Sequence, residues 1–286
     1  MFHSKSDDDI PVAAATVVDA GPLLATGVAA DPPLANTIEY EAIPKLLFVD
    51  MQQEDDEKVA AAVTKLAGLL NKSNANWKVN AVQALSLGAI AIILLVMRKW
   101  HCNRSIQFHG FLVLAWFGCY AAAELNGPYP TTSGVLQSYH GYIKTIHHHA
   151  GARATAFAVS IFKSGGIETI MAAMKSFPDD AGIQAGGCNA IGNAFCWPNP
   201  TTDEAMARFV HKLNGIELVV LVMKKFQNNA SVQQMGCCVL RQLSRIEALR
   251  DALKKRGALS AVGEATEKHD DNDVQVCATA FFKNMF

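Results

Sequence analysis

One pair of helices recurs along this chain, and that recurrence constrains the fold more than any other feature of the sequence. The clearest copy spans residues 166–195. Its first half carries apolar residues with the spacing i, i+3, i+4, i+7, which predicts one face of a helix. These residues are Ile167, Ile170, Met171 and Met174. Pro178 ends this helix, and Asp180 can cap a second one, because its carboxylate accepts unpaired N–H groups of the first turn.

Two columns of residues align this copy with three others. A branched residue followed by glutamine begins the second helix of each copy, at Ile106-Gln107, Ile183-Gln184, Val232-Gln233 and Val274-Gln275. A tiny residue follows in each, at Gly110, Gly187, Gly236 and Ala278. Two helices can cross closely only where neither carries bulk, so the second column predicts tight helix packing.

A shorter helix precedes three of the pairs, in residues 153–163, 203–213 and 246–256. Each runs into glycine, which ends a helix readily because it tolerates positive φ. Three helices in about 42 residues match the length of an armadillo repeat.

The motif in residues 165–194 reads GGIE-x-I-x-x-A-M-K followed by D-D-x-x-I-Q-x-x-G-C-x-A-I-x-N-A. It resembles degenerate armadillo repeats, in particular those of the armadillo region of leucine-rich-repeat kinases. The resemblance implies an all-α, armadillo-type α-solenoid, a right-handed superhelix of three-helix repeats. It also implies a concave groove that binds protein segments.

The sequence predicts two regions. Residues 1–35, acidic near the start and rich in small residues, are expected to be a disordered tail. Residues 36–286 are expected to be the repeat domain, with an atypical first unit as an N-terminal cap. The expected units are about 36–87, 88–118, 153–196, 203–244 and 246–286, with an insertion at 119–152.

In armadillo proteins the second helix of each pair lines the groove, and a late asparagine can hold a peptide backbone through its paired donor and acceptor. The resemblance therefore implies a set of groove residues. They are Trp116, Asn193, Gln242 and Asn284 in the late column, Asn189 and Cys238 one turn earlier, and Arg241 beside them. Arg241, together with Lys283 and Arg245, would make the C-terminal half of the groove mildly basic and suited to acidic segments. The alternative is that the amides only bridge adjacent repeats.

Composition narrows the range of partners. The formal net charge is −1, which gives no electrostatic reason to expect nucleic acid or a membrane surface as a partner. Seven cysteines occur without a C-x-x-C pair, which predicts free thiols in a reducing compartment. We expect the cytoplasm, with the nucleus as the alternative.

The sequence thus predicts a non-enzymatic scaffold for a protein or peptide partner, with no catalytic residues, metal or cofactor. One alternative is a membrane hairpin at 84–123, although its two apolar runs are shorter than the roughly 20 residues that a bilayer requires. Another is an enzyme whose site lies in the 119–152 insertion and uses Tyr139, His140 or the triplet His147–His149. The apolar end of the last helix further suggests self-association through that helix.

Overall fold

The computed structural model describes residues 37–123, 152–195 and 200–286. The chain divides into residues 1–32 and a second unit, Pro33–Phe286, which contains all the described helices. The expected tail at 1–35 and most of the expected insertion therefore lie outside the described residues.

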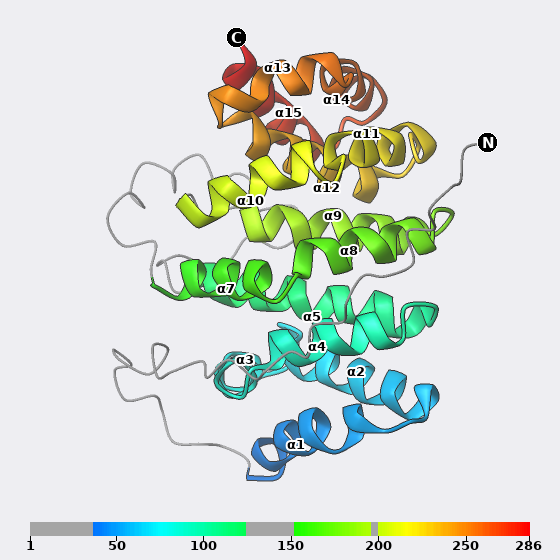
Figure 1. Cartoon of the computed structure of the whole chain (residues 1–286), viewed down its shortest axis with the longest axis vertical. Coiled ribbons are helices and arrows are strands. Elements are labelled where there is room, and N and C mark those ends of the chain that lie inside the picture. The colour runs from blue at the N-terminus through cyan, green and yellow to red at the C-terminus, as the bar shows by residue number, and fades with distance from the viewer. Residues whose placement is uncertain (1–36, 124–151, 196–199) are drawn as a thin grey trace, which may run out of the picture. The chain divides into compact units, whose positions relative to one another are not determined.

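The described residues of this unit form helices in consecutive groups (Figure 1). The first group is α1 (Thr37–Phe48), the short 3-10 helix η1 (Asp50–Gln52) and α2 (Asp56–Leu70). Four triplets follow: α3 (Trp77–Ser86), α4 (Ala89–Lys99) and α5 (Arg104–Ala123); α7 (Ala152–Lys163), α8 (Gly166–Ser176) and α9 (Ala181–Phe195); α10 (Pro200–His211), α11 (Gly215–Lys225) and α12 (Ala230–Ser244); α13 (Glu247–Lys255), α14 (Ala258–Lys268) and α15 (Asn272–Met285).

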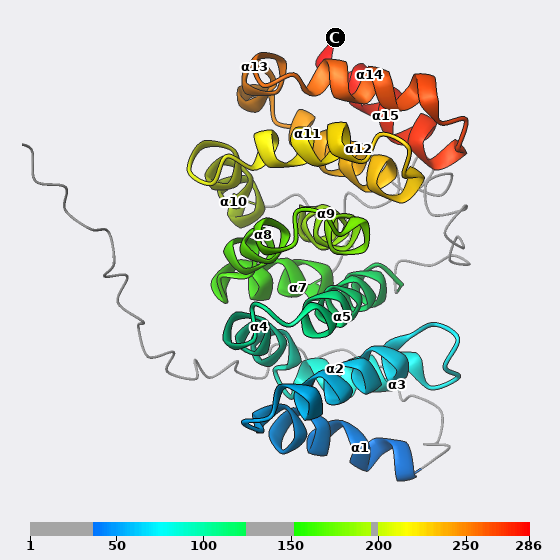
Figure 2. The ribbon, with the colours of Figure 1, turned by 90° about the vertical axis from the view of Figure 1, so that its right-hand side faces the viewer.

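The third helices of the triplets stack directly on one another. Helix α5 packs between α2 and α9, and α12 packs between α9 and α15. Figure 2 shows the triplets following one another in chain order, each covering the next. The buried side chains form a cluster that runs from Ile43 to Met285 through every triplet. The unit is an all-α, armadillo-type solenoid of three-helix repeats, as the sequence predicted.

A residue with positive φ joins the first helix of each triplet to the second. These residues are Gly88, Gly165, Asn214 and Gly257, with φ of 76°, 65°, 55° and 80°. Three are glycine because a side chain strains this conformation, and asparagine is among the residues that tolerate it best. The turn places α4, α8, α11 and α14 across the preceding helix.

In every triplet, the glutamine near the start of the third helix caps the C-terminal end of the second helix. Gln184 Nε2 donates to the carbonyl oxygens of Met174 and Phe177, at 2.7 and 2.8 Å. Gln107 does the same with Met97 and Trp100, Gln233 with Met223 and Phe226, and Gln275 with Thr266 and His269. The last turn of a helix has carbonyls without an intrahelical partner, and one buried amide satisfies two of them. This explains the glutamine that the sequence pattern showed.

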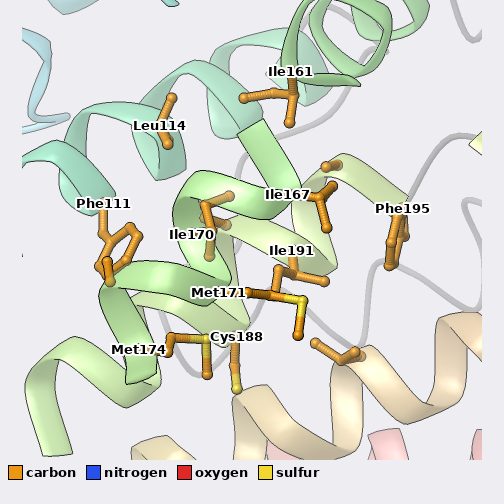
Figure 3. Packing of buried hydrophobic residues seen from close by; sticks show 14 of the residues in the cluster. Phe111, Leu114, Ile161, Ile167, Ile170, Met171, Met174, Cys188, Ile191 and Phe195 are labelled. Carbon is orange, nitrogen blue, oxygen red and sulfur yellow. The ribbon is translucent and has the colours of Figure 1, made fainter. Parts of the chain in front are cut away.

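The small column makes room for methionine. A Cβ placed on Gly187 would lie 2.5 Å from Met174 Cγ, and one on Gly236 would lie 2.5 Å from Met223 Cγ. A Cβ on Gly110 would lie 2.7 Å from Met97 Sδ. The expected tight packing is confirmed, and its main partner is a methionine of the same triplet. Figure 3 shows Met174 in the core of the third group, beside Cys188.

Polar contacts link successive triplets at their edges. Glu168 of α8 pairs with Arg208 of α10, and Glu217 of α11 pairs with Arg256 after α13. Both glutamates come from the recurring Gly-Ile-Glu sequence. Such partly exposed pairs contribute only about 0–1 kcal/mol each, so they help to align neighbours more than they stabilise the stack.

The unit boundaries differ from those expected. Helix α3 ends at Ser86, two residues before the positive-φ Gly88, just as α7 ends at Lys163, two residues before Gly165, so α3 is the first helix of the second group and not the last helix of the cap. Helix α5 continues to Ala123, five residues past the expected boundary at 118, because Cys119–Ala123 contain no helix breaker. In the last triplet Gly257 takes the positive-φ position that Asn214 takes in the triplet before it.

Within the described residues, no single helix is long and apolar enough to cross a membrane. Two helix pairs pass the same test of length and composition together: α3 with α4, bent by 78°, and residues 156–163 of α7 with α8, bent by 65°. Apolar core helices of other proteins also pass this test. Here α4 buries six residues and α8 buries seven.

Candidate protein-binding face

A stripe of partly exposed side chains recurs on the third helices. We call it the third-helix face: Phe108, Leu112 and Trp116 on α5; Ala185, Asn189 and Asn193 on α9; Gln234 and Cys238 on α12; Val276, Ala280 and Asn284 on α15. Members of one helix are four residues apart, so they lie one turn above another on the same side. The side chains between them are mostly buried in the stack.

The N-terminal end of the face is aromatic and basic. Trp116 is half-buried, and the ammonium of Lys72, in the turn after α2, lies 5.9 Å from its ring centroid. This distance allows a cation–π interaction. Phe108 precedes Trp116 by two turns and carries Arg104 5.6 Å above its ring. The N-terminal end of the face thus combines aromatic rings with two basic side chains.

Asn189 and Asn193 lie in the middle of the face. Asn193 Nδ2 donates to Asn189 Oδ1 at 3.2 Å, so the pair is linked within α9. Asn193 also packs on α5, because a Cβ on Gly118 would lie 2.9 Å from Asn193 Cβ. Both asparagines remain partly exposed.

The placement of Gln242 and Arg241 contradicts their expected role as groove residues. Only 2% of Gln242 and 5% of Arg241 is exposed. The carbonyl oxygen of the Gln242 side chain accepts a hydrogen bond from Arg245 at 2.8 Å, and that arginine also reaches the Phe195 carbonyl at 3.4 Å. Gln242 is thus part of the packing between α9 and α12. The expected basic half of the groove loses Arg241, whereas Lys283 is exposed.

Asn284 partly bridges two repeats. Its Nδ2 donates to Ser244 Oγ of α12 at 3.0 Å, which is the alternative role that the sequence left open for the amide column. Asn284 is half-buried. In the late column, Trp116 and Asn193 stay partly exposed on the surface. Gln242 is buried and Asn284 bonds to the neighbouring repeat, so both contribute to packing between repeats.

Cys238 is the one member of the face with a strongly shifted pKa. A hydrogen bond from Cys277 of α15 and the positive charge of Arg241 lower the pKa of the Cys238 thiol to about 6, against desolvation, which raises it. The same hydrogen bond, followed by burial, raises the pKa of Cys277 well above its usual value. The sequence placed Cys238 on the face but gave no sign of Cys277.

The face contains residues that the sequence argument did not select. Phe108, Gln234 and Val276 sit one turn before the chosen columns and are also partly exposed. The same four-residue spacing would have found them. Lys72 belongs to a turn outside the repeat alignment, so no column pointed to it.

A hollow of about 410 Å³ lies away from this face, at the turn between α4 and α5, lined by residues 99–105 and by Asp56. Within the described residues, no group of three His, Cys, Asp or Glu side chains could hold a metal ion. Tyr139, His140 and His147–His149, on which the enzyme alternative rests, lie outside the described residues.

Comparison with known proteins identifies no family. No family model matches the sequence, and no curated protein matches it. Among solved structures, an engineered protein from the Northeast Structural Genomics Consortium superposes with a TM-score of 0.52 at 16% identity, over 87% of this chain and 98% of that one. This likeness supports the fold alone.

Two designed armadillo repeat proteins are more distant in structure. One has a TM-score of 0.46 at 10% identity, over 86% of this chain and 99% of its own. The other, solved in complex with the peptide (KR)4, has a TM-score of 0.45 at 12% identity, over the same shares of the two chains.

Proposed function

We propose that this protein is a non-enzymatic scaffold that binds an extended peptide or a protein surface across the third-helix face. One observation carries the proposal. Successive third helices each leave a stripe of side chains uncovered at the same repeat positions, so the stripes join into one surface across α5, α9, α12 and α15. A stack of helices that served only its own packing would not need accessible aromatic and amide groups at these positions.

The composition of the face suits a peptide backbone with apolar side chains. Trp116 belongs to the residue types that dominate binding energy at interfaces, and Asn189 can offer both a donor and an acceptor to a peptide group. Two lysines, the half-buried Lys72 at one end and the exposed Lys283 at the other, favour a segment that carries acidic residues. The motif likeness to the armadillo region of leucine-rich-repeat kinases is in keeping with such a role, and we propose kinship with that group.

The proposal also covers the compartment and assembly. The six cysteines that the structure describes are all free, which agrees with a reducing compartment such as the cytoplasm or nucleus. Self-association through α15 is a second proposal, supported by Phe286, which is 91% exposed. An exposed aromatic of this size favours contact with another apolar surface.

Peptide display against the purified full-length chain, kept reduced, tests the scaffold proposal. We expect selected peptides to lose at least tenfold in affinity on Trp116→Ala and on Asn189→Ala, measured by fluorescence anisotropy. Tenfold equals about 1.4 kcal/mol, within the range of interface hot spots. Leu221→Ser is the matched control, because Leu221 is 64% exposed on α11, a second helix outside the face.

Two results would refute the scaffold proposal. One is a set of selected peptides whose affinity does not change in either face variant. The other is a loss of affinity in Leu221→Ser that equals the loss in Trp116→Ala. Hydrogen exchange with a bound peptide adds an independent readout, since protection should appear on α5 and α9 and not on α11.

A further inference from the structure

Four cysteines gather along α12, which packs between α9 and α15. Cys188 lies on α9, Cys237 and Cys238 are neighbours on α12, and Cys277 lies on α15. Three of them, Cys188, Cys237 and Cys277, are fully buried, and we call them the three buried thiols. Cys238 alone is partly exposed, on the third-helix face, where a Cβ on Gly192 would lie 3.6 Å from its sulfur.

Two side chains contact the Cys238 sulfur and favour its thiolate form. Arg241, one turn further along α12, makes a hydrogen bond to this sulfur and is only 5% exposed. A guanidinium cannot shed its proton, so a buried arginine requires a nearby group that can carry negative charge. The thiol of Cys277 reaches the same sulfur from α15.

As a result, the four thiols of the cluster differ in how readily they lose a proton. The pKa of Cys238, lowered to about 6 by Cys277 and Arg241, makes it mostly thiolate at neutral pH. Burial raises the pKa of Cys188 and of Cys237 to about 12. Cys277 stays protonated and donates to the thiolate. One nucleophilic sulfur therefore lies against one protonated thiol of the neighbouring helix, and two inert thiols lie nearby.

We propose that Cys238 and Cys277 form a redox-active pair, in which a hydroperoxide oxidises Cys238 and Cys277 then closes a disulfide between α12 and α15. In the first step the Cys238 thiolate attacks the terminal oxygen of the hydroperoxide. The O–O bond breaks, Cys238 becomes a sulfenic acid, and the alkoxide or hydroxide leaves with a proton from solvent. In the second step the Cys277 sulfur attacks the Cys238 sulfur, and the S–O bond breaks. The hydroxyl leaves with the thiol proton as water, so two electrons pass to the hydroperoxide overall.

The exposures of the two sulfurs fit these two roles. The partly exposed Cys238 can meet a small oxidant, whereas Cys277 is fully buried and contacts Cys238. Because Cys238 belongs to the third-helix face, oxidation would alter the surface that we propose binds a partner. That consequence rests on the proposed function, but the thiol chemistry can be measured on the protein alone.

Peroxide treatment followed by peptide mass spectrometry tests the pair. The reduced full-length chain receives an equimolar amount of hydrogen peroxide, and remaining thiols are then blocked with N-ethylmaleimide. We expect a cross-linked peptide that joins Cys238 to Cys277 and has lost two hydrogens. In Cys277→Ser the reaction should stop at the sulfenic acid, which dimedone traps on Cys238. Cys237→Ser is the matched control and should behave as wild type.

The pH profile of alkylation gives a readout that a purely structural cysteine would not produce. A thiol with a pKa of about 6 is almost fully ionised above pH 7, so labelling of Cys238 by iodoacetamide should rise less than twofold between pH 7 and 9. A thiol with the ordinary value of about 8.5 would rise about 25-fold over the same range. Arg241→Met should move the profile of Cys238 toward this ordinary behaviour, and Arg241→Lys should largely preserve the flat profile.

Three results would overturn the redox proposal: a steep alkylation profile at Cys238 in the wild type, dimedone on Cys237 or Cys277 instead of Cys238, or no linked peptide after peroxide. None of them bears on the binding test above, which is done in reductant. Failure of the redox pair and failure of the scaffold role can therefore be told apart.

Discussion

Replacing Gln184 with methionine tests the glutamine column most directly. Gln184 is 1% exposed, and its amide donates to the carbonyls of Met174 and Phe177. The Met174 carbonyl would otherwise bond to the N–H of residue 178, but that residue is proline and has none. The Phe177 carbonyl keeps the N–H of Asp180 at 3.2 Å. The substitution, which preserves volume, therefore leaves one buried carbonyl unsatisfied and removes one shared bond.

The expected cost follows from these contacts. An orphaned buried carbonyl costs about 1–3 kcal/mol, and a lost hydrogen bond costs about 0.5–1.5 kcal/mol. Against this, the variant removes Gln184 Oε1, which is buried and has no hydrogen-bond partner within the described residues. We expect a net loss of about 2 kcal/mol. Gln275→Met is the matched control, because Gln275 is half-buried and water can reach its carbonyls, so it should lose less than about 1 kcal/mol.

Urea unfolding, followed by far-UV circular dichroism and by tryptophan fluorescence, measures both variants. Repeat stacks can unfold in steps, so the two probes must agree before a single free energy is assigned. Equal losses for Gln184→Met and Gln275→Met, or a loss below about 0.5 kcal/mol for Gln184→Met, would refute the view that this amide replaces the hydrogen bond that proline removes.

Three further predictions follow from the packing and the thiols. Gly187→Ala should lower the free energy of unfolding by about 1–3 kcal/mol, because it forces a methyl group against Met174. In the Met174→Ala background the same substitution should cost much less, which a double-mutant cycle measured by urea unfolding would show. The three buried thiols keep protons that an unfolded chain loses above about pH 8.5, so stability should fall by about 4 kcal/mol per pH unit there, about 1.4 for each thiol. Cys188→Ala should reduce that slope by about a third, measured by urea unfolding at pH 9 and 10. Phe286→Ser should lower any self-association, and sedimentation equilibrium with unchanged dimer content would remove the proposed role of α15.

The repeat fold could be predicted because its signals are local. Apolar spacing, the Gln column and the positive-φ glycines each depend on a few neighbouring residues, and they mark the helices and their turns correctly. Helix α3 was assigned to the wrong unit although Gly88 carries the same signal as Gly165. Its short length and atypical sequence make it resemble part of an N-terminal cap, whereas only the turn residue marks it as the first helix of a triplet.

The candidate face was harder to predict because accessibility depends on contacts between repeats. Trp116, Asn193, Gln242 and Asn284 occupy one column, yet only Gln242 is fully buried. Its neighbour Arg245 draws the amide into the packing toward α9. The alignment shows which residues are equivalent, but it cannot show which long side chain folds over its neighbour. No sequence signal links Cys277 to Cys238 for the same reason, since the two residues lie on different helices.

The fit between methionine and glycine has a consequence for how such a chain can be lengthened. Both partners belong to one triplet, and in the last triplet they differ together: Ala278 replaces glycine where Thr266, whose carbonyl is bonded by Gln275, replaces methionine. A gene segment that encodes a whole triplet would bring its own matched pair to a new position. A crossover between the second and third helices of the last triplet would instead set a methionine against Ala278, so recombination between triplets should yield folded chimeras more often than recombination inside that triplet.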